Sequence, residues 1–257
     1  MRYAIIAAGE GSRLAAEGIT QPKPLVKIGS EAMIDRLIRI FMQNDADEIV
    51  VICNAAMPEV ASHLQMLQRE GLQGHSVPLR YVVKTTPSSM HSFYEISPFL
   101  EDRFILTTVD TIFHEDEFAD YVRAFNRLTT SDSCDGLMGV TDYIDDEKPL
   151  YIGLEEQGTR DKGQGNTCSL ITGFYDNPPV PCSLTPAPLN VSAGIYGLTQ
   201  KSFITLRGCV ERGEQRMRNF QRALLRDRLQ LYAYPFTKVF DIDHATDIEK
   251  ANCFVER

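Results

Sequence analysis

Basic residues are not in excess in this 257-residue chain, where 26 lysines and arginines stand against 35 aspartates and glutamates. The formal net charge is −9. General nucleic-acid binding needs a basic surface that displaces counterions, so this balance argues against a DNA or RNA partner. It does not argue against a nucleotide, because a few local cations are enough for one triphosphate.

Long apolar runs are also missing. No stretch approaches the roughly 20 residues that a membrane-spanning helix needs. The apolar run near the N-terminus is too short for the core of a signal peptide. We therefore expect a cytoplasmic protein with no membrane span.

Closely spaced cysteines are missing as well. The six cysteines, at positions 53, 134, 168, 182, 209 and 253, are scattered and form no Cys-x-x-Cys pair. Disulfides are rare in cytoplasmic proteins. Most of these side chains are therefore expected to be small buried apolar groups rather than metal ligands.

What the first half does contain is a regular alternation of strands and helices. The apolar runs that predict strands are Tyr3–Ala8, Glu48–Cys53, Leu79–Lys84 and Phe104–Val109. Segments with helical spacing lie between them, and Glu115–Leu128 predicts a further helix. Such alternation is typical of right-handed βαβ crossovers and a parallel sheet.

The second half follows a different pattern. Its predicted strands are Leu137–Val140, Leu150–Leu154, Ser169–Tyr175 and Val191–Leu198, with predicted loops at Gly158–Asn166 and Asn177–Pro188. Helical spacing returns at Lys201–Gly213 and Gln215–Asp227, before a strand at Leu229–Pro235 and a helix from Thr246. We predict one α/β domain over residues 1–257, Rossmann-like, with a mostly parallel mixed sheet and helices on both faces.

A glycine-rich turn follows the first predicted strand. Without a Cβ, Gly9 and Gly11 allow backbone N–H groups to approach an anion closely. The turn is not a P-loop, because no Gly-Lys-Ser/Thr follows it. It is a poor dinucleotide fingerprint, because Leu14 replaces the third glycine and polar or helix-breaking residues continue to Ser30. We therefore expect a longer loop.

That loop carries two cations, Arg13 and Lys23. Fixed cations can stabilise the charge that builds on a phosphate undergoing substitution. On these residues alone, two exposed loop side chains with no role are an equal alternative.

The wider motif resembles a known family. Ile6-Ala7-Ala8-Gly9-Glu10-Gly11-Ser12-Arg13-Leu14, followed by Pro22-Lys23-Pro24-Leu25, is similar to the signature of the sugar-phosphate nucleotidyltransferases, or NDP-sugar pyrophosphorylases, which have a glycosyltransferase-A-like fold. The resemblance implies a nucleotide-binding half of about residues 1–130 and an acceptor-binding half of about residues 131–257. It implies that Arg13 and Lys23 are catalytic. The residues that would wrap the NTP phosphates are Ala8, Gly9, Gly11 and Ser12.

Acidic residues at two places suit a metal ion. Asp110 directly follows the predicted strand Phe104–Val109, and open α/β sheets bind ligands beyond the carboxyl ends of their strands. An aspartate there is also a common turn former. The resemblance matches Asp110 to the family's metal aspartate, although Val109 stands where the family has Gly or Asp.

The second metal carboxylate has two candidates, Asp241 and Asp243. On an extended segment their period-two spacing would point both side chains the same way, so both are kept. Mg²⁺ is the expected cofactor, because it takes one or two carboxylates together with phosphate oxygens.

The acceptor side departs from the family pattern. Asn190–Tyr196 resembles the acceptor-lining strand, in which Gly194 would permit close approach, although a packing glycine is an equal alternative. Where the family carries Glu-Lys-Pro, this chain has Asp176-Asn177-Pro178, so Asn177 replaces the lysine that holds a sugar phosphate.

The segment before the third helix departs as well. The family's Gly-Thr-Ala is replaced by Thr86-Pro87-Ser88-Ser89-Met90-His91-Ser92, which looks closer to cytidylyltransferases acting on small alcohol phosphates such as phosphocholine. Ser88 and Ser89 are predicted contacts to the base or phosphates. His91 is expected to pack at the helix start, with a ligand contact as the alternative.

The predicted function is an Mg-dependent transfer of NMP from an NTP to a sugar 1-phosphate or small alcohol phosphate, with release of pyrophosphate. The expected partners are an NTP and a phosphorylated small molecule, with base and acceptor left open. One alternative is a catalytically silent nucleotide- or nucleotide-sugar-binding module, which the change at Asn177 favours. Another is a glycosyltransferase, whose Asp-x-Asp motif would lie at the wrong end of the chain, at Asp241 and Asp243.

An arginine-rich helical region between Arg207 and Arg228 lies outside these motifs. We expect it to be a solvated face. A subunit contact in a homo-oligomer and a site for an anionic regulator are the alternatives.

Overall fold

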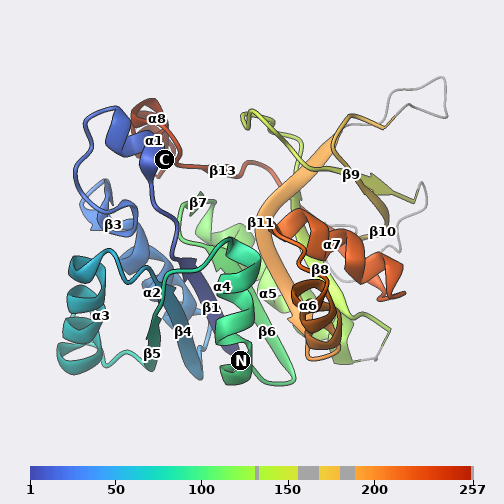
Figure 1. Ribbon diagram of the computed structural model, residues 1–257, viewed down its shortest axis with the longest axis horizontal. Coiled ribbons are helices and arrows are strands. Elements are labelled where there is room, and N and C mark those ends of the chain that lie inside the picture. Colours follow the sequence, from blue (N-terminus) through green and yellow to red (C-terminus); the bar gives the residue numbers. More distant parts are fainter. Residues whose placement is uncertain (131–132, 156–167, 180–188, 256–257) are drawn as a thin grey trace. The chain divides into compact units, whose positions relative to one another are not determined.

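The computed structural model describes residues 1–130, 133–155, 168–179 and 189–255 (Figure 1). These residues form two compact units. The first unit is Met1–Ile112 with Asp241–Arg257, and the second is Phe113–Phe240. The predicted loop Gly158–Asn166, most of the predicted loop Asn177–Pro188, and Cys182 lie outside the described residues.

Parallel strands form the centre of the first unit. They are β1 (Arg2–Ala7), β4 (Glu48–Cys53), β5 (Leu79–Val83) and β6 (Arg103–Thr108), in the order β5-β4-β1-β6. Every pairing is parallel, and Ala4 of β1 lies opposite Val50 of β4 and Leu106 of β6. The four strands predicted from apolar runs are confirmed, each to within one residue at its ends.

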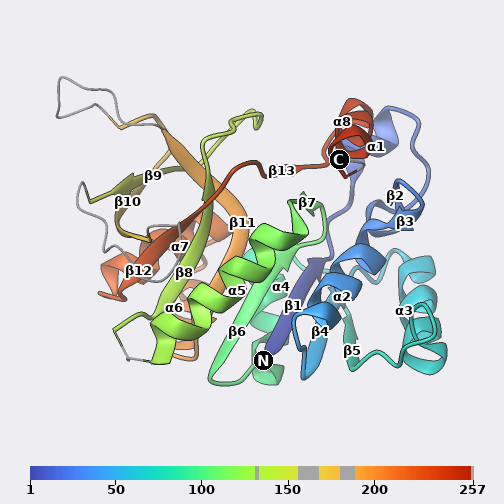
Figure 2. The same ribbon diagram turned by 180° about the vertical axis from the view of Figure 1, so that it is seen from behind.

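Helices cover both faces of these strands. In Figures 1 and 2, α2 (Met33–Gln43) lies over one face and α4 (Ser89–Ile96) over the other. The apolar stripe of α2 is buried, with Met33, Leu37 and Phe41 at most 2% exposed. The other elements of this unit are α3 (Pro58–Glu70), α8 (Ala245–Val255), the 3-10 turn η2 (Ser97–Phe99) and the short strand β7 (Thr111–Ile112).

The stretch predicted as a long loop up to Ser30 contains regular structure. It holds the short helix α1 (Ser12–Ala16), the 3-10 turn η1 (Lys23–Leu25) and a hairpin of β2 (Lys27–Ile28) and β3 (Glu31–Ala32). Leu14, which stands where a dinucleotide fingerprint has its third glycine, is only 2% exposed and anchors α1. The prediction of an irregular loop was therefore wrong, because a single buried leucine in a five-residue helix gives no periodic signal.

The second unit is built mainly from antiparallel pairs. Its strands are β8 (Gly136–Thr141), β9 (Tyr151–Leu154), β10 (Ser169–Tyr175), β11 (Asn190–Thr199) and β12 (Leu231–Phe236), in the order β11-β8-β12-β10-β9. Among the described strands of this unit, β8 and β12 are the one pair that is parallel, and β11 also pairs with β9. The α/β class is confirmed, with a mixed sheet whose purely parallel part belongs to the first unit.

Three helices complete the second unit. Helix α5 (Glu115–Thr130) lies against β8, whereas α6 (Ser202–Glu211) and α7 (Met217–Arg226) pack together and α7 contacts β10. In its core Phe113 stacks on Phe118, and Tyr121 meets Tyr234 edge-on. No helix within the described parts of the chain is long and apolar enough to cross a membrane. Strand β13 (Phe240–Asp241) lies at the boundary in sequence between the units.

Candidate active site

A cavity of about 510 Å³ opens at the carboxyl ends of the parallel strands in the first unit. The chain proceeds from β1 outward to β4 and β5 and then returns to β6 on the other side of β1. The carboxyl ends of β1 and β6 therefore form a topological switch point, where open α/β sheets bind ligands. The cavity is lined by the turn after β1, Lys23, Thr86–Ser89, Val109–Asp110 and Asp243.

The two glycines of the turn differ in what the fold demands of them. Gly11 has a φ of 62°, in the left-handed region, and a Cβ there would lie 3.1 Å from the Cβ of Lys23. Gly9 has no positive φ, and a Cβ at its position would meet nothing within 4 Å. The fold therefore requires glycine at position 11 but not at position 9. Ala8 and Ser12 line the same cavity.

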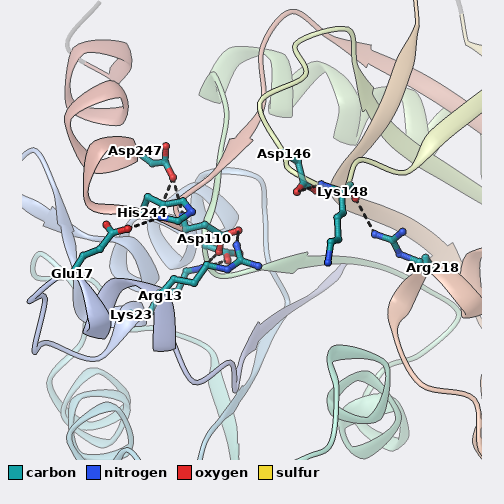
Figure 3. Close-up of polar contacts among 10 residues, drawn as sticks. Arg13, Glu17, Lys23, Asp110, Asp146, Lys148, Arg218, His244 and Asp247 are labelled. Carbon is teal, nitrogen blue, oxygen red and sulfur yellow. Dashed lines mark hydrogen bonds and ion pairs between the residues drawn. The ribbon is translucent and has the colours of Figure 1, made fainter. Parts of the chain in front are cut away.

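A cluster of four charged side chains, Arg13, Lys23, Asp110 and Asp243, lines this cavity. The first three are labelled in Figure 3. The ammonium of Lys23 contacts the carboxylate of Asp110 and lies 3.0 Å from Oδ1 of Asp243. Nη1 of Arg13 donates to Oδ2 of Asp243 at 2.5 Å. The Lys23 side chain is only 10% exposed and that of Arg13 is 53% exposed. Of the two cations, only Arg13 is exposed, and it lies on α1 rather than in a loop.

Opposite charges keep Lys23 and Asp110 ionised. Burial alone would lower the pKa of Lys23, but the carboxylates of Asp110 and Asp243 outweigh it and hold that pKa above its ordinary value. Burial would likewise raise the pKa of Asp110, but the Lys23 ammonium and a hydrogen bond from Thr108 hold it below its usual range. Lysine and aspartate are therefore both charged near neutral pH.

The structure brings Asp243 into this cluster and not Asp241. The extended segment ends at Asp241, so the two side chains do not point the same way as they would on a strand. Asp241 is exposed and does not line the cavity. The carboxylate of Asp247 accepts the backbone N–H groups of Asp243 at 3.1 Å and His244 at 2.8 Å, which turns the chain into α8.

Glu17, just after α1, fixes the same turn and was missed by sequence reasoning. Its carboxylate accepts the backbone N–H of Ala245 at 2.6 Å and lies 2.6 Å from Nδ1 of His244 (Figure 3). The N–H of Ala245 is the main reason that the pKa of Glu17 is lowered. The contact joins residues 228 positions apart, so no local pattern could reveal it.

Asn54 is a second residue that the sequence did not single out. Its amide donates to the carbonyl of Ala8 at 3.1 Å and accepts from the hydroxyl of Thr85 at 2.7 Å and the N–H of Ala56 at 3.0 Å. Asn54 follows β4, Ala8 follows β1 and Thr85 lies beyond β5. One buried amide thus ties together the carboxyl ends of three strands.

The predicted serine contacts lie on the remaining wall of the cavity. Ser88 and Ser89 both line it, at the start of α4. Oγ of Ser88 lies 2.9 Å from Nδ1 of His91. His91 is therefore hydrogen-bonded at the start of the helix.

The residues present suit a magnesium ion. The carboxylates of Asp110 and Asp243 both contact one ammonium, that of Lys23, so their oxygens converge on a single cation. No group of three or more carboxylate, histidine or cysteine side chains suited to a metal occurs among the described residues. Mg²⁺ does not need one, because it is commonly bound by one or two carboxylates with phosphate oxygens and waters.

The two predicted acceptor residues belong to the second unit. Gly194 on β11 has a φ of 71°, where the register of β11 against β8 shifts between Ser192 and Tyr196. A β-bulge at this position therefore explains the glycine by the backbone conformation that it adopts. Asn177 follows β10 and lines a groove with Lys148 and Arg218.

Of the five described cysteines, four are buried and Cys253 is exposed.

Comparisons with known proteins bear on this geometry. The family profile described as nucleotidyl transferase matches residues 3–257. A UTP--glucose-1-phosphate uridylyltransferase from Synechocystis sp. is 28% identical over 120 residues, which are 44% of this chain and 31% of that protein. The match thus spans about a third of the length of that curated relative.

Solved structures share the fold. A UTP-bound UGPase from Acinetobacter baumannii is 19% identical, with a TM-score of 0.74 over 99% of this chain and 92% of that chain. An inositol-1-phosphate CTP transferase from T. maritima is 15% identical, with a TM-score of 0.71 over 100% of this chain and 96% of that chain. Because the family profile matches almost the entire sequence, this chain belongs to the nucleotidyl transferase family.

Proposed function

We propose that this protein transfers a nucleoside monophosphate from an NTP to a sugar 1-phosphate or another small alcohol phosphate, with release of pyrophosphate. The observation that carries the proposal is the cluster at the switch point. There the nearly buried ammonium of Lys23 and the guanidinium of Arg13 meet two carboxylates, those of Asp110 and Asp243. Both cations lie on the segment that follows the glycine-rich turn. That set supplies positive charge for phosphate oxygens and hard oxygen ligands for a metal ion.

The reaction needs positioning and charge rather than a base. An oxygen of the acceptor phosphate attacks the α-phosphorus in line, forming one P–O bond as the bond to the leaving pyrophosphate breaks. The nucleophile is already an anion, so no side chain has to remove a proton. Arg13 and Lys23 would stabilise the negative charge that builds on the α-phosphate oxygens.

The carboxylates have a complementary role. Asp110 and Asp243 would hold Mg²⁺, which when bound neutralises phosphate charge and orients the reacting groups. Lys23 contacts the same two carboxylates, and its ammonium holds the pKa of Asp110 below its usual range. Asp241 is the weaker candidate, because it lies outside the cavity lining.

The turn after β1 is proposed to pass close to the phosphates. The fold leaves space around Gly9 for a side chain, so the need for glycine there would come from the approach of the nucleotide. Ala8, Gly11 and Ser12 belong to the same wall, and Ser88 and Ser89 would contact the base or phosphates. Asn177 and Gly194 are proposed to contact the acceptor. Cytoplasmic location and the oligomeric state stay predictions.

Pyrophosphate release tests the proposal. The full chain is incubated with each of four NTPs, Mg²⁺ and a panel of hexose 1-phosphates and alcohol phosphates. Turnover with at least one pair is expected, and Arg13→Ala should abolish most of it. Arg69→Ala, which removes a 75%-exposed arginine of the same unit, is the matched control and should not change the rate.

Two outcomes would overturn the assignment. Nucleotide binding without turnover on any pair would indicate a silent binding module. Formation of a nucleoside diphosphate from an NDP-sugar would indicate a glycosyltransferase.

A further inference from the structure

Three side chains of the segment after β1 contact the segment that leads into α8, and all of these residues belong to the first unit. Arg13 and Lys23 both meet Asp243, whose Oδ2 accepts from Arg13 and whose Oδ1 lies 3.0 Å from the Lys23 ammonium. The third side chain, Glu17, contacts the two residues that follow Asp243. These contacts differ in whether the proposed reaction needs the groups that make them.

Both contacts to Asp243 occupy groups that the proposed reaction uses. Arg13 and Lys23 would turn toward phosphate oxygens, and the two oxygens of Asp243 that they contact would face Mg²⁺ instead. Both cations are repelled by a metal ion beside the same carboxylate. The pairings with Arg13 and Lys23 therefore do not by themselves keep Asp243 in place through the reaction.

Glu17 makes a contact that the reaction leaves intact. Its Oε2 accepts the backbone N–H of Ala245 at 2.6 Å, and its Oε1 lies 2.6 Å from Nδ1 of His244 (Figure 3). Neither Glu17 nor His244 lines the cavity. Both oxygens of this carboxylate are thus engaged by the residues next to Asp243, away from the reacting groups.

The same carboxylate completes the start of α8. The first N–H groups of a helix have no acceptor within it. Asp247 accepts the N–H groups of Asp243 and His244, and Glu17 accepts that of Ala245. Asp247 is part of α8, whereas Glu17 directly follows α1. Of these two carboxylates, Glu17 is therefore the one that ties the turn to the segment carrying Arg13.

We propose that Glu17 is a positioning residue, which holds Asp243 at the cavity while Arg13 and Lys23 exchange its carboxylate for phosphate oxygens. Hydrogen-bond partners that orient a metal ligand affect metal affinity strongly. Glu17 acts through the backbone of the turn and not on the reacting atoms. The inference rests on the proposed function, in which Asp243 holds Mg²⁺.

Direct metal binding tests this role. Mn²⁺ is titrated into the full chain as a paramagnetic probe of the Mg²⁺ site, and the free ion is measured by electron paramagnetic resonance. Glu17→Ala should bind Mn²⁺ about tenfold more weakly than wild type, because Asp243 is no longer held. Glu17→Gln keeps an oxygen that can accept the N–H of Ala245 and should recover most of the loss. Glu249→Ala, which removes an exposed glutamate of α8, is the control and should match the wild type.

Steady-state kinetics separate positioning from a general weakening of the fold. In Glu17→Ala the Mg²⁺ concentration for half-maximal pyrophosphate release should rise about tenfold, whereas kcat at saturating Mg²⁺ and the KM for the acceptor should stay within about twofold. The side chains of Glu17 and His244 are each 38% exposed, so the melting temperature should change little. A joint fall of kcat and melting temperature, with unchanged Mg²⁺ dependence, would overturn the proposal.

Two Mn²⁺ results would also overturn it. One is wild-type affinity in Glu17→Ala, and the other is equal weakening in Glu17→Ala and Glu17→Gln. If the wild type binds no Mn²⁺, the metal role within the proposed function fails, and hydrogen exchange without metal decides about Glu17. Faster exchange of the amides of residues 243–245 in Glu17→Ala than in Glu249→Ala supports its hold on the turn, and equal exchange refutes it.

Discussion

The two units carry inverted versions of the same charge arrangement. In the first unit one ammonium, that of Lys23, lies between two carboxylates and is 10% exposed. In the second unit one carboxylate, that of Asp176, lies between two guanidinium groups and is 54% exposed. The difference in burial decides the energetics, because breaking a buried pair leaves an uncompensated charge, whereas exposed pairs contribute little. The cluster around Lys23 should therefore contribute to the stability of the fold, whereas substitutions around Asp176 should change that stability little.

Among the variants that test this difference, Lys23→Ala should have the largest effect on stability. It leaves Asp110 largely buried without its cation, and we expect the free energy of unfolding to fall by about 3 kcal/mol. Urea denaturation followed by circular dichroism measures the change. Asp176→Ala is the counterpart in the second unit and should leave the unfolding midpoint unchanged. Equal losses in the two variants would show that burial does not separate the clusters.

Substitutions of Asp243 and Asp241 should differ in their effect on activity rather than in their effect on stability. Asp243→Asn is expected to lower kcat by about a hundredfold or more, because it removes one of the two carboxylates proposed to hold Mg²⁺. Asp241→Asn, two positions away and outside the cavity, is the control and should retain wild-type kcat. The measurement is pyrophosphate release at saturating Mg²⁺. Loss of activity on changing Asp241 instead would reverse the assignment.

The two glycines of the turn should divide structure from function. Gly11→Ala forces a Cβ into the left-handed region against Lys23 and should cost about 1 kcal/mol of stability. Gly9→Ala should leave the melting temperature unchanged but raise the KM for NTP. Thermal unfolding and steady-state kinetics on both variants measure this. A stability loss at Gly9 equal to that at Gly11 would contradict the steric argument.

The smallest effect is expected at the start of α8. Asp247→Ala removes the acceptor for two backbone N–H groups and should cost about 1 kcal/mol. Burial would raise the pKa of Asp247, but the N–H of His244 and the ammonium of Lys250 hold it low. Its stabilisation is therefore present above the unfolded value of about 3.9 and is lost as pH falls through the lower folded pKa. Urea denaturation from pH 7 to pH 3 should show a shallower loss for the variant.

Much of the first unit could be predicted because its strands are buried on both faces. Continuous runs such as Glu48–Cys53 and Tyr3–Ala8 leave little choice of structure. The site was harder to resolve, because it depends on contacts across the whole sequence. Asp243 could not be separated from Asp241 without knowing that the extended segment ends at Asp241 and that Asp247 then turns the chain into α8. No local pattern marks Glu17.

The groove of the second unit shows a different limit of sequence reasoning. The expected Glu-Lys-Pro was sought at Asp176–Pro178 and found missing there. The same three residues, Glu-Lys-Pro, occur at Glu147–Pro149, two strands earlier, and Lys148 lines a groove with Asn177. Which strand brings a lysine to a given place is a property of topology, which spacing along the chain does not contain.

The first unit is interrupted in sequence by the whole of the second. Arg13 and Asp243, which share a hydrogen bond, are 230 positions apart. During synthesis the ribosome releases Arg13, Lys23 and Asp110 before the second unit, and the last carboxylate only after it. Until then the growing chain carries an incomplete charge cluster, which can close only once the whole second unit has been made.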